Sequence, residues 1–275
     1  MIRSFTICLF FFHLVFATEA QNRMEIIHKL PKSIIECKWE NINSNRLELI
    51  FYNKDYCPYY VSYSFGRTDF LDPGKNIVYS TNKDSKSRSS FKDSWKYRYW
   101  RGKFLEKFNP NRTYALPVAN GKTVNWEQNL NELVKTMEFS SQLGDTIYAV
   151  RNGIACETTH PLHLLVHHAD NTFAAYFDLA INFIKPGIKI KTGQPIGISN
   201  KNSISISFFF LDKNKFGKDL RSSGYPYSHF IPIFRTTEGD LKLEPHKDYE
   251  ALIDDALIMQ EMNKREQKAY LKNKQ

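Results

Sequence analysis

The sequence predicts a mainly-β protein with an N-terminal antiparallel β module, a second β-sheet domain and a C-terminal amphipathic helix. Short runs rich in β-branched and aromatic residues recur along the chain, separated by turn residues. In the second half such runs follow one another at roughly ten-residue spacing with little helix between them. The final segment instead carries apolar residues at helical spacing. The 275 residues, 42% hydrophobic and 15% aromatic, are typical of a globular chain of one large domain or two small ones.

Residues 1–20, "MIRSFTICLFFFHLVFATEA", predict a secretory signal peptide. One basic residue precedes an apolar run that closes on Thr18-Glu19-Ala20, with small residues where a signal peptidase reads the chain. The run is too short for a spanning helix, and we expect no transmembrane segment after the signal. We therefore expect an exported protein, periplasmic or secreted, beginning at Gln21. A retained N-terminal anchor is the alternative.

Residues 21–108 are expected to form the N-terminal β module. The runs "SIIECKWE", "RLELIFYN" and "YYVSYSF" predict strands, and residues 43–45 and 53–55 punctuate them as turns. Residues 67–94 are polar and predict a long exposed loop. The run "WKYRYWRGKF" predicts a last, half-buried strand.

Residues 109–245 are expected to form the second domain, an all-β sandwich or barrel-like sheet. Its strand-like runs are "DTIYAVRNGIACET", "LHLLVHHAD", "TFAAYFDL", "IKIKTGQPIGIS" and "SISISFFFLD". Residues 246–275 predict an amphipathic helix with a basic tail, because Leu252, Ala256, Met259 and Met262 recur at helical spacing.

The net charge indicates which classes of partner to expect, and the cysteines bear on whether disulfides form. The formal net charge of +9 favours anionic partners, such as a wall polymer, and the expected export argues against nucleic acid. A solvated basic surface without a partner is equally compatible. Beyond the signal the cysteines are Cys37, Cys57 and Cys156. Pairing Cys37 with Cys57 would leave Cys156 as a buried thiol, but the sequence does not fix the pairing.

Several motifs in the second domain resemble a known family. "GDTIYAVRNGIACE" resembles G-x-P-V-x-A-x-x-x-G-x-V, and "LLVHHADNTFAAYFDL" resembles a hydrophobic strand, a turn and a Y-x-H-L strand. "IKPGIKIKTGQPIGIS" resembles the hairpin V-x-x-G-x-x-V-x-x-G-x-x-I-G, and "SISISFFFLD" stands where H-x-H-F is expected. Residues 113–237 thus resemble the LytM/lysostaphin-type zinc endopeptidase domain, the murein endopeptidases built on the duplicated hybrid motif.

The resemblance implies a zinc ion held by two imidazoles and one carboxylate, with further histidines that assist the metal-bound water. In this chain the ligand aspartate falls on Glu138, and no histidine precedes it in "NLNELVKTMEFSS". The Y-x-H-L histidine falls on Asp178, and the H-x-H pair falls on Ser205 and Ser207. The resemblance therefore implies a degenerate member, with no catalytic residue and no metal ligand retained. The expected remnant groove is formed by Glu138, Tyr176, Asp178, Ser205 and Ser207.

Other histidines do not readily rebuild the site. On a strand, His163 and His167 share a face but lie roughly 13 Å apart, while His168 points to the other face. Cys156 has the apolar context of a buried structural thiol rather than a nucleophile.

Three functions remain open. The first is an inactive LytM-like protein, without a cofactor, that binds cell-wall peptide or another wall hydrolase. The second is a divergent zinc metalloendopeptidase that uses Glu138, Asp178 and a recruited histidine to cleave peptidoglycan peptide. The third is a basic structural protein of the envelope, held on anionic wall polymer.

Overall fold

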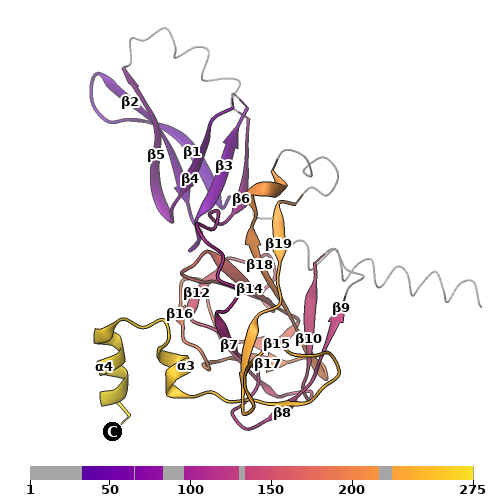
Figure 1. Cartoon of the computed structure of the whole chain (residues 1–275). Helices are drawn as coiled ribbons and strands as arrows, with labels where there is room; N and C mark the ends of the chain where they lie inside the picture. Colours follow the sequence, from indigo (N-terminus) through magenta and orange to yellow (C-terminus); the bar gives the residue numbers. More distant parts are fainter. Residues whose placement is uncertain (1–32, 65, 83–95, 130–133, 217–224, 275) are drawn as a thin grey trace, which may run out of the picture.

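The structure, a computed structural model, describes residues 33–64, 66–82, 96–129, 134–216 and 225–274 (Figure 1). Most of these residues lie in or between β-strands, so the predicted mainly-β fold is confirmed. The predicted signal peptide lies outside the described residues. None of the described helices has the length and apolar character needed to cross a bilayer.

The N-terminal module consists of two three-stranded antiparallel sheets, drawn in indigo and purple in Figure 1. One sheet has the order β1–β2–β5, with β1 (Ile35–Asn41), β2 (Arg46–Asn53) and β5 (Gly74–Asn82). The other has the order β4–β3–β6, with β3 (Tyr59–Tyr63), β4 (Thr68–Leu71) and β6 (Tyr97–Arg101). The first hairpin turn lies where the sequence predicted it, because the Asn43 side chain accepts the backbone N–H groups of Asn45 and Arg46.

The predicted long loop over residues 67–94 is wrong for its first half, because β4 and β5 lie there. Leu71 and Val78 are buried in the core of the module. The turn at residues 72–73 carries the chain from one sheet to the other, since β4 pairs with β3 and β5 pairs with β2. Polar residues on the outer face of these strands hid their alternation in the sequence. Residues 83–95 lie outside the described residues.

The second unit is organised around one large sheet, here called the main sheet. Its strand order is β16–β12–β13–β14–β18–β10–β9, and β19 pairs with the far end of β18. These strands are β9 (Trp126–Asn129), β10 (Thr136–Ser140), β12 (Gly153–Cys156), β13 (Leu164–His167), β14 (Thr172–Phe177), β16 (Lys189–Ile190), β18 (Ser203–Leu211) and β19 (Tyr227–His229). A 3-10 turn, η1 (Lys213–Lys215), follows β18.

Three smaller sheets complete the second unit. Their orders are β11–β17–β15, β21–β20–β7 and β22–β8, and β20 and β7 pair in parallel. These strands are β7 (Thr113–Ala115), β8 (Thr123–Val124), β11 (Thr146–Tyr148), β15 (Leu179–Asn182), β17 (Pro195–Ser199), β20 (Ile233–Thr236), β21 (Gly239–Leu241) and β22 (Tyr249–Glu250).

The hairpin that resembled the family motif has a steric reason for its last glycine. Gly197 lies on β17, which pairs with both β11 and β15. A Cβ atom at this position would lie 2.5 Å from the backbone oxygen of Ile181. Since real Cβ atoms do not approach an oxygen so closely, only glycine fits without a backbone shift.

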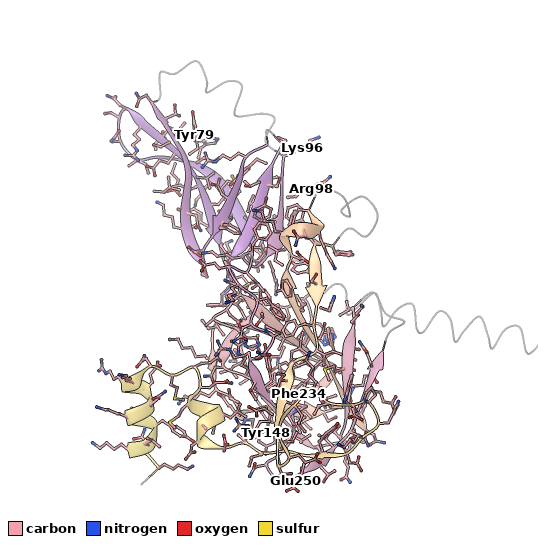
Figure 2. All side chains as sticks on the ribbon, viewed as in Figure 1. Tyr79, Lys96, Arg98, Tyr148, Phe234 and Glu250 are labelled. Carbon is pink, nitrogen blue, oxygen red and sulfur yellow. The ribbon has the colours of Figure 1, made fainter. Side chains whose placement is uncertain are left out.

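Two hydrophobic cores lie on opposite sides of the main sheet. One is inside the second unit and includes Ile204, Ile206 and Phe208 of β18, together with Phe234, which is labelled in Figure 2. The other combines residues of the main sheet, such as Phe173 and Phe209, with the core of the N-terminal module. The main sheet is therefore covered on both sides, which explains the long apolar runs in its strands.

The C-terminal segment forms two short helices rather than the single predicted one. They are α3 (Asp255–Met259) and α4 (Lys264–Lys272), and the preceding β22 pairs with β8 of the second unit. Asn263 starts a new helix because its side chain accepts two N–H groups of the first turn of α4, while Glu266 accepts the Asn263 N–H. This capping box breaks the continuous helix that apolar spacing alone predicted.

Candidate functional site

Strand alternation brings three of the predicted site residues to one side of the main sheet. On β10, Met137 and Phe139 face the inner core, so Glu138 points the other way. On β18, Ser205 and Ser207 likewise alternate with the inward isoleucines. We call this side the module-facing side, because its apolar residues, among them Phe173 and Phe209, join the core of the N-terminal module.

Glu138 and Ser205 contact each other directly. They are opposite residues in the pairing of β10 with β18, and the Ser205 hydroxyl donates to Glu138 Oε1 at 3.3 Å. Ser207 is fully buried, and its hydroxyl donates to the carbonyl oxygen of Lys135 at 2.9 Å. The two serines therefore hold neighbouring strands together where the resemblance places imidazoles.

Asp178 lies at the junction of β14 and β15 with a left-handed backbone, φ 57°. Its backbone N–H donates to Nδ1 of His163 at 3.0 Å, and one carboxylate oxygen lies 3.6 Å from Nζ of Lys201. Neither contact follows from the sequence, because both partners come from other strands or turns. His163 also packs against the ring of Phe177, so it belongs to the same corner of the sheet.

Tyr176 does not join these residues, and its predicted place in the groove is corrected. It alternates with Phe177 and lies in the inner core, on the opposite side from Ser205. Its buried hydroxyl accepts the backbone N–H of Val150 at 2.8 Å, and burial raises its pKa. The tyrosine thus holds the residues after β11 in place, which is a structural contact.

The residues of this corner do not fit the zinc centre that the resemblance implies. That centre requires two imidazoles and a carboxylate around one point. Here the matching side chains are carboxylates and hydroxyls, and Nδ1 of the nearby His163 already accepts a backbone N–H. Within the described parts of the chain, three metal-binding side chains converge only at Asp55, Cys57 and Cys156, which is a different place.

The N-terminal module covers much of the module-facing side. Gly102, with φ +102°, passes so close over Phe173 that an added Cβ would lie 3.1 Å from its ring. Polar contacts reinforce the interface: Arg101 donates to the Glu157 carbonyl at 2.6 Å, and the Tyr227 hydroxyl donates to the Arg101 carbonyl at 3.1 Å. This interface does not follow from the sequence, because it joins residues far apart in the chain.

The paired histidines 167 and 168 lie on opposite faces, as their positions on a strand predicted. Nε2 of His167 lies 3.2 Å from Oδ1 of Asn171, and its ring packs on Phe173. His168 is fully buried on the other side, where its Nδ1–H donates to the Asn152 carbonyl at 2.6 Å.

We predict that acid destabilises the protein through two buried histidines. Burial lowers the pKa of His168 to about 3 and that of His229 to about 4. Because the unfolded imidazole titrates near 6.5, the unfolded chain binds more protons below that pH. Each histidine should therefore cost about 1.4 kcal/mol per pH unit as the pH falls from about 6.5 toward its folded pKa.

Urea unfolding at pH 7, 6 and 5 measures this dependence. The matched variant His168→Gln keeps an N–H donor for the Asn152 carbonyl but does not titrate. Its slope against pH should fall by about one proton's worth, about 1.4 kcal/mol per unit, whatever its absolute stability. A slope equal to that of the unchanged chain would contradict the assignment to His168.

Comparisons with known proteins return structural matches alone. No family model matches the chain, and no curated protein does. Among solved structures, the chain matches the M23 metalloprotease pseudoalterin from the deep sea at 13% identity, covering 35% of this chain and 69% of that one, with a TM-score of 0.31.

Two further matches come from named bacteria. A putative M23 peptidase from Pseudomonas aeruginosa is 11% identical, with 61% of this chain and 69% of that one covered and a TM-score of 0.31. A zinc-containing peptidase from Vibrio cholerae is 11% identical, with 69% and 87% covered and a TM-score of 0.30. The first two of these structures are thus named as M23 peptidases and the third as a zinc-containing peptidase. Part of this chain is similar to solved M23 peptidases.

Proposed function

We propose that this chain is an exported LytM-like protein without peptidase activity, which acts by binding cell-wall peptide or a wall hydrolase. One observation carries the proposal. At the corner where the resemblance places the zinc centre, the Ser205 hydroxyl bonds to Glu138 and the Ser207 hydroxyl bonds to a backbone carbonyl. A serine hydroxyl is a poor zinc ligand at neutral pH, so these positions supply neither a metal site nor an acid–base imidazole.

The position of the N-terminal module also supports a loss of catalysis. The apolar part of the module-facing side is buried under it, and Ser205 is only 6% exposed. A peptidase of this class needs an open position on its metal for water and substrate. A covered face with small hydroxyls serves packing better than hydrolysis.

A binding role has a candidate surface at the open end of the same corner. The side chains of Asp178 and Lys201 are 33% and 43% exposed, and Glu138 is partly exposed. A rim with both signs of charge suits a peptide or a protein partner that carries both signs. Export is supported by the composition of residues 1–20.

Zinc content and wall hydrolysis test the proposal together. The mature chain, purified without a histidine tag and dialysed against trace zinc, should retain less than about a tenth of an ion. It should release no fragments from purified peptidoglycan. It should nevertheless co-sediment with insoluble peptidoglycan or form a complex with a wall hydrolase. Asp178→Ala should weaken that co-sedimentation, whereas Asp72→Ala, an exposed aspartate of the N-terminal module, should not.

The divergent peptidase is the alternative that one observation favours, because His163 lies beside Asp178. Close to one zinc ion per chain, lost in Glu138→Ala and accompanied by release of wall fragments, would replace our proposal with this one. Zinc without hydrolysis, or hydrolysis that survives Glu138→Ala, would contradict both.

A further inference from the structure

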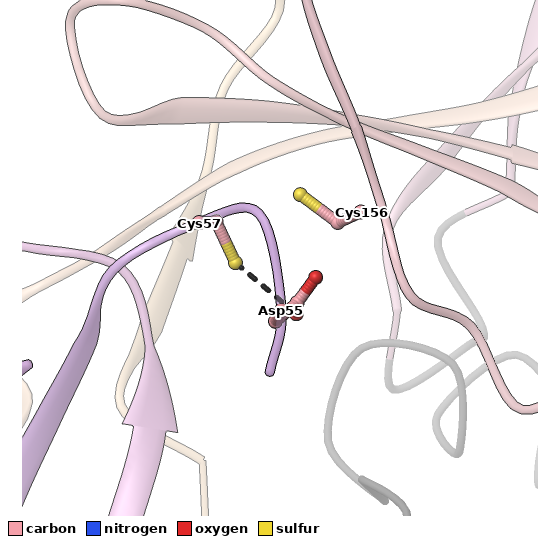
Figure 3. A group of neighbouring side chains, drawn as sticks. All are labelled: Asp55, Cys57 and Cys156. Carbon is pink, nitrogen blue, oxygen red and sulfur yellow. Dashed lines mark hydrogen bonds between the residues drawn. The ribbon is translucent and has the colours of Figure 1, made fainter. Parts of the chain in front are cut away.

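Two cysteines meet where the N-terminal module touches the main sheet (Figure 3). Cys57 lies in the turn between β2 and β3, whereas Cys156 ends β12 in the second unit. Both are buried, and their sulfur atoms, with a carboxylate oxygen of Asp55, all lie within 4.8 Å of one another. Cys37, on β1, is half-buried and does not belong to this group.

The carboxylate of Asp55 is already saturated by donors from the protein. Its Oδ1 accepts the backbone N–H groups of Tyr56 at 2.7 Å and Glu157 at 2.8 Å. Its Oδ2 accepts the hydroxyl of Tyr59 at 2.6 Å and the Cys57 thiol at 3.3 Å. A cation would have to displace these bonds.

The charge around the cluster also disfavours a cation. The guanidinium of Arg101 is buried, and its Nη2 lies 3.5 Å from Oδ2 of Asp55. A divalent ion at the same place would be held beside this fixed positive charge in a dry environment, with two thiolates and no free carboxylate. The cluster is therefore better suited to a bond between the two cysteines than to binding a metal ion.

We propose that Cys57 and Cys156 form a disulfide bond that joins the N-terminal module to the main sheet. The inference rests on the proposed export, because disulfides persist in oxidising compartments. It differs from the pairing of Cys37 with Cys57 that the sequence left open, because Cys37 is not among the three side chains that converge here. The sulfur atoms lie within 4.8 Å of each other, and a disulfide requires them to approach to about 2.05 Å by rotation of the two side chains.

The chemistry is thiol–disulfide exchange with an oxidised dithiol oxidoreductase or oxidised glutathione. The thiolate of Cys57 or Cys156 attacks the external disulfide, forming a mixed disulfide and releasing one external thiolate. The other cysteine then attacks the mixed disulfide, which forms the internal bond and expels the second thiolate. Two cysteine thiols are oxidised, one external disulfide is reduced to two thiols, and the protons pass to solvent and to those thiols.

Both thiols are buried once the module is docked, so an external disulfide reaches them more readily before docking is complete. Burial also raises the pKa of the Cys57 thiol, which makes the docked cysteine a poorer nucleophile. Once formed, the bond closes a loop of roughly 100 residues and opposes separation of the module from the sheet. It thereby keeps the module-facing side, with Ser205 and Ser207, covered.

Peptide mapping without reduction tests the bond in chain recovered from the compartment to which it is exported. After alkylation in denaturant, we expect a cross-linked peptide pair containing Cys57 and Cys156, with Cys37 alkylated. Cys37→Ser should keep the pair, whereas Cys57→Ser and Cys156→Ser should each lose it. Reduction should lower the midpoint of thermal unfolding by about 10 °C. Alkylation of all three cysteines, or a pair that includes Cys37, would overturn the inference.

A second preparation separates this inference from the proposed export. Reduced chain refolded with oxidised glutathione should form the same bond, whatever route it takes in the cell. Failure to do so, or protection of the thiols by bound zinc that a chelator removes, would overturn the disulfide itself. A bond that forms in this preparation, while the chain from cells is reduced and still carries residues 1–20, would instead overturn the export.

Discussion

Replacing Asp55 with alanine is expected to lower the free energy of unfolding by about 3–5 kcal/mol. The carboxylate is buried and accepts four donors, and it is the anionic neighbour of Arg101. Removing it leaves the guanidinium buried without its charge partner. The backbone N–H of Glu157, which comes from the second unit, loses its acceptor as well. The loss therefore falls on the interface between the two units.

Denaturant unfolding measures this effect, with reductant present so that no disulfide masks it. Asp72→Ala is the matched control, because that carboxylate pairs with Lys103 at the surface and is 67% exposed. It should cost less than about 1 kcal/mol. Asp55→Asn keeps an acceptor oxygen but not the charge, so it should fall between the two. Equal losses for Asp55→Ala and Asp72→Ala would show that the interface does not depend on this carboxylate.

Local pattern was sufficient to predict the strands that form the candidate site. The alternation of serine and isoleucine in "SISISFFF" predicts a strand with one small polar face, and Ser205 and Ser207 do lie on one side of β18. The same rule places Tyr176 on the opposite side from its neighbours, yet the motif grouped it with the groove. Alternation along the strand was the better guide, since it reflects the pleat itself.

Contacts between distant segments could not be predicted in this way. The pairing of Glu138 with Ser205 depends on the register of β10 against β18, and the approach of Cys57 to Cys156 depends on how two units dock. Hydrophobicity shows that a face is buried but not what covers it. For the same reason the sequence left the pairing of its cysteines open, because it does not show which of them lie close together in the fold.

Two elements were predicted wrongly from the local pattern of polar and apolar residues. The polar stretch after residue 67 contains strands because only alternate side chains need be apolar when one face meets solvent. At the C-terminus, apolar spacing predicted one helix, but the capping box at Asn263 outweighed it. At residues 67–94 polarity was weighed above alternation, whereas at Asn263 periodicity was weighed above a local signal for a helix start.

The second large effect is expected at Arg151, where alanine should lower the free energy of unfolding by about 3–5 kcal/mol. Its guanidinium is buried and joins two parts of the second unit. Nη1 donates to the Tyr114 and Thr172 hydroxyls and lies 2.9 Å from a carboxylate oxygen of Asp170. Nε donates to Glu261 at 3.0 Å, in the segment between α3 and α4. Burial would raise the pKa of Asp170, but this guanidinium and the hydrogen bonds from Thr172 together outweigh it and lower that pKa to about 2.

The C-terminal helices should depend on the same arginine more than the main sheet does. No residue of α4 is buried, so little apolar area holds that helix in place. Glu261→Ala removes the anchor of this segment but leaves Arg151 its contact with Asp170, and it should cost about 1–2 kcal/mol. Hydrogen exchange in α4 should accelerate in Glu261→Ala while β14 keeps its protection.

Comparing the losses of unfolding free energy in Arg151→Ala and Glu261→Ala shows whether the Arg151–Glu261 contact holds the C-terminal segment in place. The loss for Arg151→Ala should exceed that for Glu261→Ala, because the first removes the Arg151 salt bridges of both Asp170 and Glu261, whereas the second leaves the one with Asp170 intact. Lys274→Ala is the surface control: its pair with Asp255 ties α4 to α3, but the lysine is 59% exposed. If Lys274→Ala loosened α4 as much as Glu261→Ala does, the helix would be held by its surface pairs. The buried guanidinium would then stabilise the sheet alone.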